Sequence, residues 1–424
     1  MGHTLAEKIL LNHTDEDDVR PGDIVQVRCD LVMANDVSGP VAFRQMAKMG
    51  AEKVFDPNKV VMVADHFMPA KDARSAELQK RLKEWSNAQG VAYYGQGRGG
   101  IEHTLLVQEG WVVPGMVLAG GDSHTCTYGA LGAFGTGLGS TDIASCLVFG
   151  EFWQAVPETI RIDFTGTKDA YVTGKDLILA VIDRIGVAGG TDKVLEFTGE
   201  GAEALSIDER LAVANMAVEA GSESGLFLTD DVTIDYLDGV TERPYSVDVS
   251  DPDAEFADQV SIELDRMPPL VSKPHSPGNV ASVVEVAGTK VDQVYIGNCA
   301  NGTMTDLRQT AEMLEGNRVH PDVRAIIVPA TQKIYREAMG EGLLDQFVEA
   351  GAIVSTPTCG ACFGGHMGVM GPGETALTTT NRNFKGRMGS GEASVYLANA
   401  YVAAAAAVSG EIVHPADVMG RSAA

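Results

Sequence analysis

The chain has 424 residues, of which 45% are hydrophobic and 21% charged, and its formal net charge is −26 at pH 7. At one domain per roughly 100–200 residues, this length predicts two to four domains with a sizeable core. The negative charge argues against a nucleic-acid partner, because phosphate backbones are bound by basic surfaces. No apolar run is long enough to span a membrane, and the first residues lack a signal-peptide core, so we expect a cytoplasmic protein.

The first part of the chain alternates between strand-like and helix-like segments. The predicted elements are, in order, helix 5–11, strand 24–29, helix 41–49, strand 60–64, helix 74–89, strand 91–94, helix 101–109 and strand 116–119. Residues 30–36 carry polar groups at an expected strand end. Strands that alternate with helices indicate βαβ units and a parallel sheet, so the predicted fold class is α/β.

Composition shifts predict three domains. A boundary near 155 follows the glycine- and alanine-rich stretch 129–150, and four prolines between 268 and 277 suit a linker. The predicted domains are residues 1–155, a smaller α/β domain over 156–280 with helices 175–185 and 207–219, and residues 281–424. The last domain is expected to hold strands 291–296, 324–328 and 352–354, helix 334–341 and an alanine-rich helix over 392–408.

Three cysteines of the last domain have the pattern of a metal centre with an open position. Cys359 and Cys362 form a Cys-x-x-Cys pair, and Cys299 stands alone beside glycine and asparagine. Three thiolates leave one position open, which is typical of a metal centre that performs chemistry. Two alternatives remain open, namely buried apolar cysteines and a structural zinc with His366 as fourth ligand. Without a secretion signal, the six cysteines of the chain predict reduced thiols and not disulfides.

Acidic residues and histidines lie together after the apolar strands of the first domain. Asp65 and His66 follow one strand, Asp122 and His124 follow another, and His103 begins a helix after a glycine turn. A carboxylate beside a histidine fixes its tautomer and raises its basicity, which suits proton transfer. A single such histidine is more often a satisfied core residue, but three at the strand ends of one sheet favour a catalytic edge.

Two further motifs have competing interpretations. Residues 95–100 fit G-x-G-x-x-G between a strand and a helix, with Asp122 at a suitable distance for a ribose, so an NAD-dependent dehydrogenase is an alternative function. The short tyrosine-rich strand before this turn disfavours it. Arg382 and Arg387 flank a glycine, and their planar guanidinium groups suit bidentate capture of a carboxylate. The alternative is an exposed loop with ordinary arginines.

Together these motifs resemble the aconitase superfamily, and more closely its large-subunit group of isopropylmalate dehydratases and homoaconitases. The resemblance covers nearly the whole chain and rests on Cys299, the Cys359/Cys362 pair, Asn381–Arg387, Asp122–His124 and Asn215–Glu219. It implies three α/β/α domains around a [4Fe–4S] cluster that is held by the three cysteines and keeps one iron open to substrate. The implied reaction is dehydration and rehydration of a small hydroxy-di- or tricarboxylic acid.

The resemblance also implies roles for individual residues. Asp65 and His66 match the pair that protonates the departing hydroxyl. The resemblance pairs His103 with Glu219, and Asp122 with His124, around the reacting water. The substrate-binding residues that it implies are Asn35, Ser123, Asn215, Asn381, Arg382 and Arg387.

The chain departs from the family pattern in three respects. Asn35 stands where the longer relatives have glutamine or histidine. Ala300 follows the first cysteine, where the family often has threonine. The family's catalytic base is a serine on a fourth, swivelling domain, which has no counterpart before Ala424. The resemblance therefore implies a separate small subunit that carries this serine and much of the substrate selectivity. The favoured substrate is isopropylmalate, in leucine biosynthesis, with homoaconitate and dimethylmalate as alternatives. No membrane partner is expected.

Overall fold

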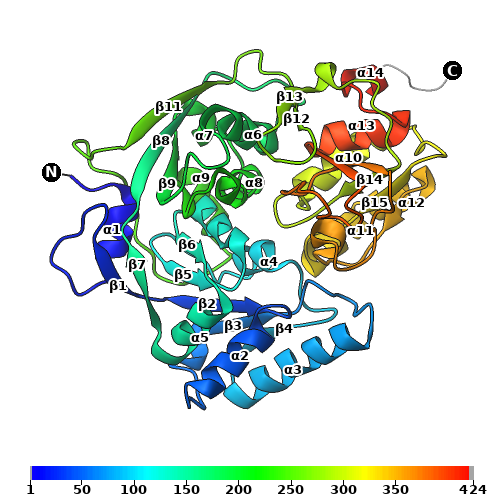
Figure 1. Cartoon of the computed structure of the whole chain (residues 1–424). Coiled ribbons are helices and arrows are strands. Elements are labelled where there is room, and N and C mark those ends of the chain that lie inside the picture. The colour runs from blue at the N-terminus through cyan, green and yellow to red at the C-terminus, as the bar shows by residue number, and fades with distance from the viewer. Residues whose placement is uncertain (1, 420–424) are drawn as a thin grey trace. The chain divides into compact units, whose positions relative to one another are not determined.

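The computed structural model describes residues 2–419, which form two compact units. Unit 1 consists of Met1–Asp65, Asp72–Thr165 and Ala188–Ile262, and unit 2 of His66–Lys71, Gly166–Val187 and Glu263–Ala424. The chain is an α/β protein with several parallel sheets (Figure 1), as predicted. The finer division into three domains remains a prediction.

Unit 1 contains a fully parallel five-stranded sheet in the order β4–β3–β2–β5–β6. Its strands are β2 (Leu31–Asn35), β3 (Val60–Val63), β4 (Ala92–Tyr94), β5 (Val117–Gly120) and β6 (Phe134–Gly137), and its helices are α2 (Gly39–Lys48), α3 (Ala73–Gln89), α4 (Glu102–Gln108) and α5 (Ser140–Phe149). Every residue of β2 and β3 is buried, as central parallel strands covered on both faces require. Segment 30–36, expected at a strand end, is thus largely the central strand itself.

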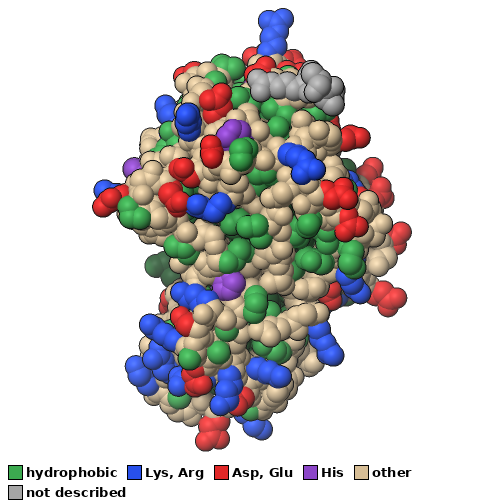
Figure 2. Space-filling view, turned by 90° about the vertical axis from the view of Figure 1, so that its right-hand side faces the viewer, with side chains coloured by type: hydrophobic (Ala, Val, Ile, Leu, Met, Phe, Trp, Pro, Cys, Tyr) green, Lys and Arg blue, Asp and Glu red, His purple; other side chains and the backbone are tan. Residues whose placement is uncertain are grey.

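Local sequence fixes the ends of α3. Asp72 caps the first turn by accepting a hydrogen bond from the Ser75 amide at 2.7 Å, and Gly90 ends the helix at a φ of 72°. The exposed basic residues of α3 are Arg74, Lys80, Arg81 and Lys83. Figure 2 shows basic side chains gathered at the bottom of the visible face, the level of α2 and α3 in Figure 1. The negative charge of the chain is therefore unevenly distributed.

Two smaller sheets complete unit 1. A four-stranded sheet has the order β10–β9–β8–β11, and β1 pairs with β7 in an antiparallel ribbon. The strands are β1 (Ile24–Arg28), β7 (Glu151–Ala155), β8 (Glu158–Thr165), β9 (Lys193–Thr198), β10 (Ser224–Phe227) and β11 (Asp258–Glu263). The predicted strand 24–29 thus lies outside the parallel sheet, because its alternating exposed and buried residues leave one face in solvent.

The helices of this part of unit 1 are short. They are α1 (Leu5–Leu11), α7 (Glu200–Glu203), α8 (Ile207–Asn215) and α9 (Asp231–Leu237), with the 3-10 helices η1 (Pro57–Lys59), η2 (Ser123–Leu131) and η3 (Ala217–Ala220). The predicted helix 207–219 therefore ends at Asn215, and η3 continues after a break at Met216, which is not helical.

Unit 2 is built on a seven-stranded sheet in the order β13–β12–β18–β17–β14–β15–β16. Its strands are β12 (Leu270–Ser272), β13 (Val280–Ser282), β14 (Gln293–Ile296), β15 (Arg324–Ile327), β16 (Ile353–Val354), β17 (Thr375–Thr378) and β18 (Ser394–Leu397). Strands β18 to β16 run parallel, and β12 and β13 are antiparallel. The parallel strands place their carboxyl ends, and the loops that follow them, at one edge.

The helices of unit 2 cover this sheet. They are α6 (Gly174–Ile185), α10 (Met304–Leu314), α11 (Gln332–Gly340), α12 (Leu343–Ala350), α13 (Ala400–Ser409) and α14 (Ala416–Met419), with η4 (Val283–Glu285) and η5 (Gly360–Phe363). The predicted helix 392–408 is wrong over its first residues, which form β18; α13 begins only after Asn399 caps it through the Val402 amide. Within residues 2–419, no helix is long and apolar enough to cross a bilayer.

Candidate functional site

Polar side chains gather at one edge of the five-stranded sheet in unit 1. Asn35 ends β2, Asp65 comes shortly after β3, and Asp122 comes shortly after β5. Strands β2, β3 and β5 are parallel neighbours, so their carboxyl ends open onto the same edge. In α/β proteins this edge is where ligands bind. The structure therefore brings together the acidic residues that the sequence placed after separate strands.

Two histidines share the carboxylate of Asp122. His103 Nε2 lies 3.1 Å from Asp122 Oδ1, and His124 Nδ1 lies 3.3 Å from the same oxygen. The other nitrogen of His124, Nε2, lies 2.9 Å from Glu219 Oε1. Both histidines and Glu219 are buried. Carboxylates at fixed positions orient the imidazole rings and decide which nitrogen carries the proton, so this array is suited to proton transfer.

This array differs in one contact from the predicted pairs. The contact of Asp122 with His124 is confirmed, but the carboxylate hydrogen-bonded to His103 is Asp122 and not Glu219. The reason lies in η2, whose N-cap is Asp122: its Oδ1 accepts the His124 amide at 2.8 Å and so stays at the sheet edge beside both rings. Ser123 is exposed at the start of η2, and Asn215 is buried, where its Nδ2 donates to Thr127 Oγ1 at 2.7 Å.

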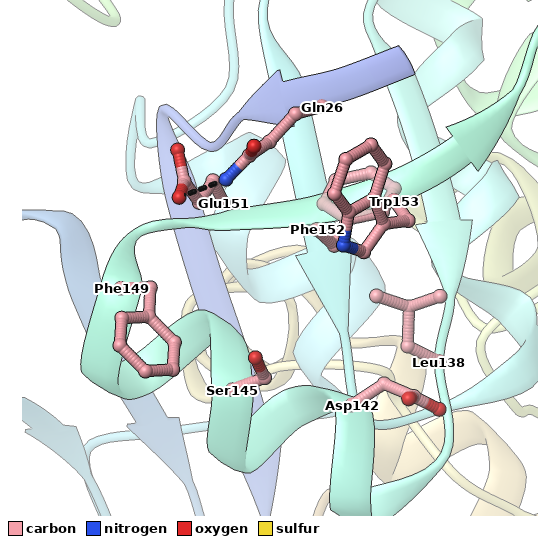
Figure 3. Close-up of a pocket in the computed structure, with 8 residues that line it drawn as sticks. All are labelled: Gln26, Leu138, Asp142, Ser145, Phe149, Glu151, Phe152 and Trp153. Carbon is pink, nitrogen blue, oxygen red and sulfur yellow. Dashed lines mark hydrogen bonds between the residues drawn. The ribbon is translucent and has the colours of Figure 1, made fainter. Parts of the chain in front are cut away.

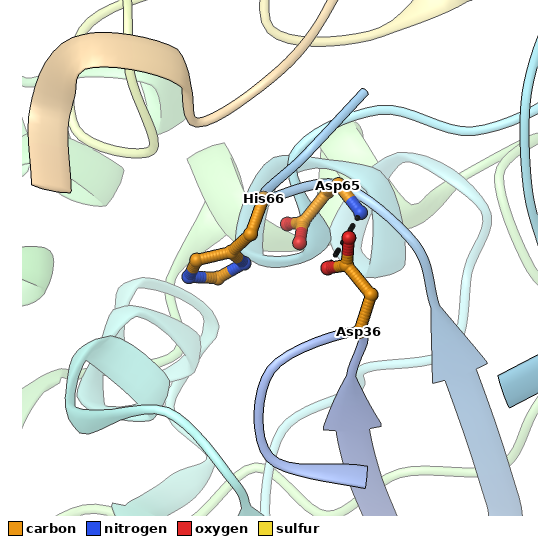
Figure 4. A group of neighbouring side chains, drawn as sticks. All are labelled: Asp36, Asp65 and His66. Atoms are coloured by element: carbon orange, nitrogen blue, oxygen red, sulfur yellow. Dashed lines mark hydrogen bonds between the residues drawn. The ribbon is translucent and has the colours of Figure 1, made fainter. Parts of the chain in front are cut away.

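A second group surrounds Asp65. Its Oδ2 accepts a hydrogen bond from the amide of Glu102 at 2.9 Å, and its own amide donates to Asp36 Oδ1 at 3.3 Å (Figure 4). Asn35 donates from Nδ2 to Glu102 Oε1 at 3.0 Å, and its amide oxygen accepts from the turn that leads into α2. These side chains are all buried. Asn35 therefore has protein partners at both ends of its amide.

The cysteines of unit 2 lie in two loops beside its sheet. Cys299 follows β14, and Cys359 and Cys362 lie at the start and inside of η5; all three are buried. Tyr295 of β14 donates from its hydroxyl to the carbonyl of Cys359 at 3.2 Å. Gly360, between the paired cysteines, has a φ of +63°, and a Cβ there would lie 2.6 Å from the Tyr295 hydroxyl. A glycine is therefore required for this turn.

Asn381 lies between the two loops. Its Nδ2 donates to Cys299 Sγ at 3.2 Å, and the Sγ of Cys362 lies 3.4 Å from its Oδ1. Arg387 donates from Nε to the carbonyl of Cys362 at 2.9 Å. Both Arg387 and Arg382 are half-buried. The structure thus brings Asn381 and Arg387 to the cysteines, within the same unit.

His66 also belongs to unit 2, although it directly follows Asp65 in the chain. Its ring packs edge-on against Phe363, with 5.0 Å between the ring centroids, and Phe363 directly follows Cys362. The Thr358 hydroxyl lies 3.5 Å from the His66 carbonyl. The predicted proton donor His66 therefore lies beside the loop that carries the paired cysteines.

The donor set fits an iron–sulfur cluster better than one zinc ion. All six cysteines of the chain are free thiols, so the three at this site are available as ligands. Among the described residues, these three do not form a group with His366 in which all ligand atoms lie within 4.8 Å of one another. The Nε2 of His366 is instead hydrogen-bonded to the carbonyl of Pro69. Three cysteine thiols from two neighbouring loops suit an iron–sulfur cluster, whose usual ligands are cysteine thiolates.

Burial changes the acidity of two groups near the cysteines. Burial raises the pKa of Tyr295 well above its ordinary value, and the negative cysteines add to this effect. Burial lowers the pKa of Lys175 to about 8, against the attraction of Asp306 and of two cysteines. The sequence pattern singled out neither residue, nor Glu102 in unit 1. A lysine in the first turn of a predicted helix carries no signal of burial before its packing is known.

Comparison with known proteins identifies the family. The sequence matches the model of the aconitase family (aconitate hydratase) over residues 7–289 and 282–410. The chain belongs to the aconitase family. It is 73% identical to "3-isopropylmalate dehydratase large subunit 2" of Rubrobacter xylanophilus over 99% of both chains. It is 51% identical to the "3-isopropylmalate dehydratase large subunit" of Desulfitobacterium hafniense, over 99% of this chain and 100% of that one.

Family membership confirms the predicted resemblance and disfavours the dinucleotide alternative. The structure supplies a physical reason as well. In a dinucleotide fold, the amides at the start of the helix after the glycine turn bind the pyrophosphate. Here α4 begins at Glu102, and its amide donates to the Asp65 carboxylate. The protein's own acid thus occupies the position that a phosphate would need.

Unit 1 also has a surface pocket of about 390 Å³ that lies apart from these residues (Figure 3). It is bounded by the β1–β7 ribbon and α5, and aromatic side chains of Phe149, Phe152 and Trp153 line it together with a hydrogen-bonded Gln26–Glu151 pair. None of the predicted site residues is among its lining residues.

Proposed function

We propose that this chain is the large subunit of a [4Fe–4S]-dependent hydro-lyase, a 3-isopropylmalate dehydratase of leucine biosynthesis. The observation that carries this proposal is the 73% identity, over 99% of both chains, to a protein of that name. The buried cysteines and the buried acid–histidine array support it with suitable chemistry. The finer architecture of three α/β/α domains around the cluster belongs to the same proposal.

Cys299, Cys359 and Cys362 would hold the cluster. When bound, a cluster with one open iron supplies a Lewis acid that polarises the hydroxyl and a carboxylate of the substrate. The chain's own contribution is to hold three thiolates and to exclude water from around them, since all three cysteines are buried. The Asn381 amide, which contacts two of the sulfur atoms, fixes the distance between the two loops.

The remaining residues would move protons and orient the substrate. Elimination of water needs a group that gives a proton to the departing hydroxyl, and His66 takes this role beside Asp65. His103 and His124, oriented by Asp122 and Glu219, would exchange a proton with the water that leaves and returns. The family resemblance implies these roles, and the contacts of the His103 and His124 rings with carboxylates support two of them.

Substrate recognition would rest on the arginines. Arg382 and Arg387 would bind substrate carboxylates, with Ser123 and Asn381 as further contacts. Asn35 and Asn215 would act by positioning, because their amides are engaged with Glu102 and Thr127. A small subunit would complete the site with a catalytic base, in keeping with the name "large subunit" carried by the relatives.

The proposal is tested on protein purified without oxygen, alone and mixed with the small subunit from the same genome. We expect brown protein with roughly four irons and equal sulfide per chain, as a [4Fe–4S] cluster contains. We expect hydration and dehydration of isopropylmalate only in the mixture. Homocitrate and dimethylmalate are assayed in parallel, because a faster reaction with either would change the assigned substrate. Colourless protein with one zinc and no activity in the mixture would overturn the proposal.

A further inference from the structure

Lys175 is a fully buried cation that the proposed reaction does not use. Its exposed fraction is 0%, and its Nζ donates to the carbonyls of Thr379 at 2.9 Å and Thr380 at 3.1 Å. Lysines are almost never fully buried unless their charge is balanced. These two carbonyls accept hydrogen bonds from the ammonium, but they carry no net charge. The balance of its charge must come from nearby anions.

The position of Lys175 in α6 does not account for its burial. It lies in the first turn of a 12-residue helix that is already capped by Thr173 and Asp176. A helix N-terminus repels a cation, because the backbone dipole is positive there. A lysine at this position therefore costs helix stability. Its contribution must lie in the contacts that its side chain reaches.

Four anions attract Lys175, and two of them belong to the cysteine site. After burial, the strongest influences on its pKa are the negative charges of Asp306, Cys299, Cys362 and Asp176, in that order. Asp176 binds Thr173, Asn399 and the Leu270 amide, and burial raises its own pKa. Asp306 caps α10 and accepts from Asn301. Two of the four attracting groups are thus proposed cluster ligands.

The hydrogen bonds of Lys175 lead to the same place. Thr379 and Thr380, whose carbonyls it holds, directly precede Asn381. The Thr379 hydroxyl also accepts the amide of Gly297, two residues before Cys299. The ammonium therefore fixes the segment from which the Asn381 amide contacts two sulfur atoms. The same side chain thus provides both a charge and a position for the cysteine site.

We propose that Lys175 is the buried counter-charge of the iron–sulfur site and the positioning residue that holds Asn381 against Cys299 and Cys362. This inference rests on the proposed cluster. Three thiolates around a [4Fe–4S] core leave a net negative charge, and one-electron reduction adds another. A buried cation stabilises the more negative state most, because Coulomb interactions are strong away from water. Lys175 therefore raises the reduction potential of the cluster and slows the loss of iron.

The test compares Lys175→Met, which keeps length and removes charge, with Lys175→Gln, which keeps a hydrogen-bond donor. Lys333→Met is the matched control, because Lys333 is an exposed lysine on α11 of the same unit. Iron and sulfide are counted after anaerobic purification, and the potential is measured by a dithionite titration followed by electron paramagnetic resonance. Retention of iron is timed against a chelator. Circular dichroism of the apoproteins reports on the fold.

We expect a lower reduction potential in both Lys175 variants and iron loss at least tenfold faster than in the control. Lys175→Gln should lose iron more slowly than Lys175→Met, because it can still bind one carbonyl. Lys175 variants that carry the full cluster and have the same reduction potential as the wild type would overturn the inference. Failure of both variants to fold as apoproteins would overturn it too, because the fold itself would then need the charge. Absence of iron from the wild type would instead overturn the proposed function.

Discussion

At the scale of single residues, Arg387 has a structural and a proposed binding role. Its Nε donates to the carbonyl of Cys362 at 2.9 Å, and a planar guanidinium head is suited to bidentate binding of a substrate carboxylate. Lysine has a single point charge and cannot hold the Cys362 carbonyl and bind a carboxylate through two parallel hydrogen bonds at the same time. We expect Arg387→Lys to lower kcat/KM by about 10- to 100-fold, from the loss of about 1.5–3 kcal/mol of charged hydrogen bonding.

The measurement is steady-state kinetics of the loaded enzyme with its small subunit. Arg318→Lys is the matched control, since Arg318 is an exposed arginine of the same unit. Iron content is measured beside the kinetics, because a change in KM with full iron separates substrate binding from damage to the cysteine loop. Unchanged kcat and KM in Arg387→Lys would remove this arginine from the binding role.

At the scale of elements, the turn between the paired cysteines depends on Gly360. A Cβ at this residue would meet the Tyr295 hydroxyl, and its left-handed backbone costs other residues about 1–3 kcal/mol. We expect Gly360→Ala to shift η5, separate the thiolates and reduce the iron retained per chain. The control is Gly373→Ala, whose φ is also positive at 76° but whose Cβ would have no neighbour within 4 Å. Equal iron in both variants would show that the close approach to Tyr295 does not matter.

His13 joins α1 to the residue before β2. Its Nδ1 contacts the Ile9 carbonyl at 2.7 Å, and its Nε2 lies 2.6 Å from Asp30 Oδ2. Burial lowers the pKa of His13, but the hydrogen bond and charge of Asp30 outweigh burial and leave that pKa raised. Burial likewise opposes the shift at Asp30, whose pKa is lowered by the bond to His13.

These two shifts give the pair a defined pH window. Because the pKa of His13 is raised in the folded protein, protonated His13 adds to the free energy of unfolding. This stabilisation is complete below the ordinary histidine pKa and is lost as the pH rises through the pKa of His13 in the folded protein. Because the pKa of Asp30 is lowered, ionised Asp30 stabilises the folded protein at every pH above the ordinary aspartate pKa. The pair therefore stabilises most between about pH 4 and 6.5. We expect the melting temperature of His13→Gln to lie further below that of the wild type at pH 6 than at pH 8.5. The reason is that the variant loses about 1 kcal/mol of stabilisation by the charged hydrogen bond at pH 6.

Thermal unfolding followed by circular dichroism at several pH values measures this difference. In an Asp30→Asn background the effect of His13→Gln should no longer be larger at pH 6 than at pH 8.5, because burial then lowers the pKa of His13 without the opposing charge of Asp30. An effect that stays equal at pH 6 and pH 8.5 in the native background would contradict the assigned ion pair.

The same elements show how far the sequence predicts this fold. Strong local signals gave the correct elements: α3 has a capping aspartate and a terminal glycine, and β3 is a continuous apolar run. The helix predicted for the region before α13 was wrong because the alanines there favour a helix, whereas Ser394–Leu397 form β18 and pair with β17 in the sheet. Long-range pairing of this kind overrides local propensity and leaves no trace in a short window.

The residues of the candidate site were likewise predictable only where their own chemistry, and not a long-range contact, marks them. The cysteines, acids and histidines were found because few residue types can perform their chemistry. Glu102 and Lys175 were missed, because their importance comes from burial beside distant segments: Glu102 accepts from Asn35, and Lys175 donates to residues more than 200 positions away. The predicted pairing of His103 with Glu219 differs from the structure for a similar reason, since η2 holds the Asp122 carboxylate within reach of both histidine rings.

At the scale of the whole molecule, a net charge of −26 opposes compactness through repulsion among surface carboxylates. Some acidic residues form ion pairs: Asp15 pairs with Arg28, and a carboxylate oxygen of Asp18 lies 3.2 Å from Nε of Arg20. Glu16 and Asp17 between them are exposed and form no ion pair among the described residues. Their charges should therefore only repel.

Salt screens such repulsion, since the Debye length falls from about 30 Å at 0.01 M to about 10 Å at 0.1 M. We expect the melting temperature of the wild type to rise over this range of sodium chloride, measured at constant pH. The double variant Glu16→Gln/Asp17→Asn should melt about 1–2 °C higher than the wild type at 0.01 M salt and should gain less from added salt. Asp15→Asn is the control, because it removes one repelling charge together with an ion pair and should give no gain. A melting temperature that does not respond to salt, in the wild type and the double variant alike, would show that the acidic surface is already balanced by the basic side chains near α3.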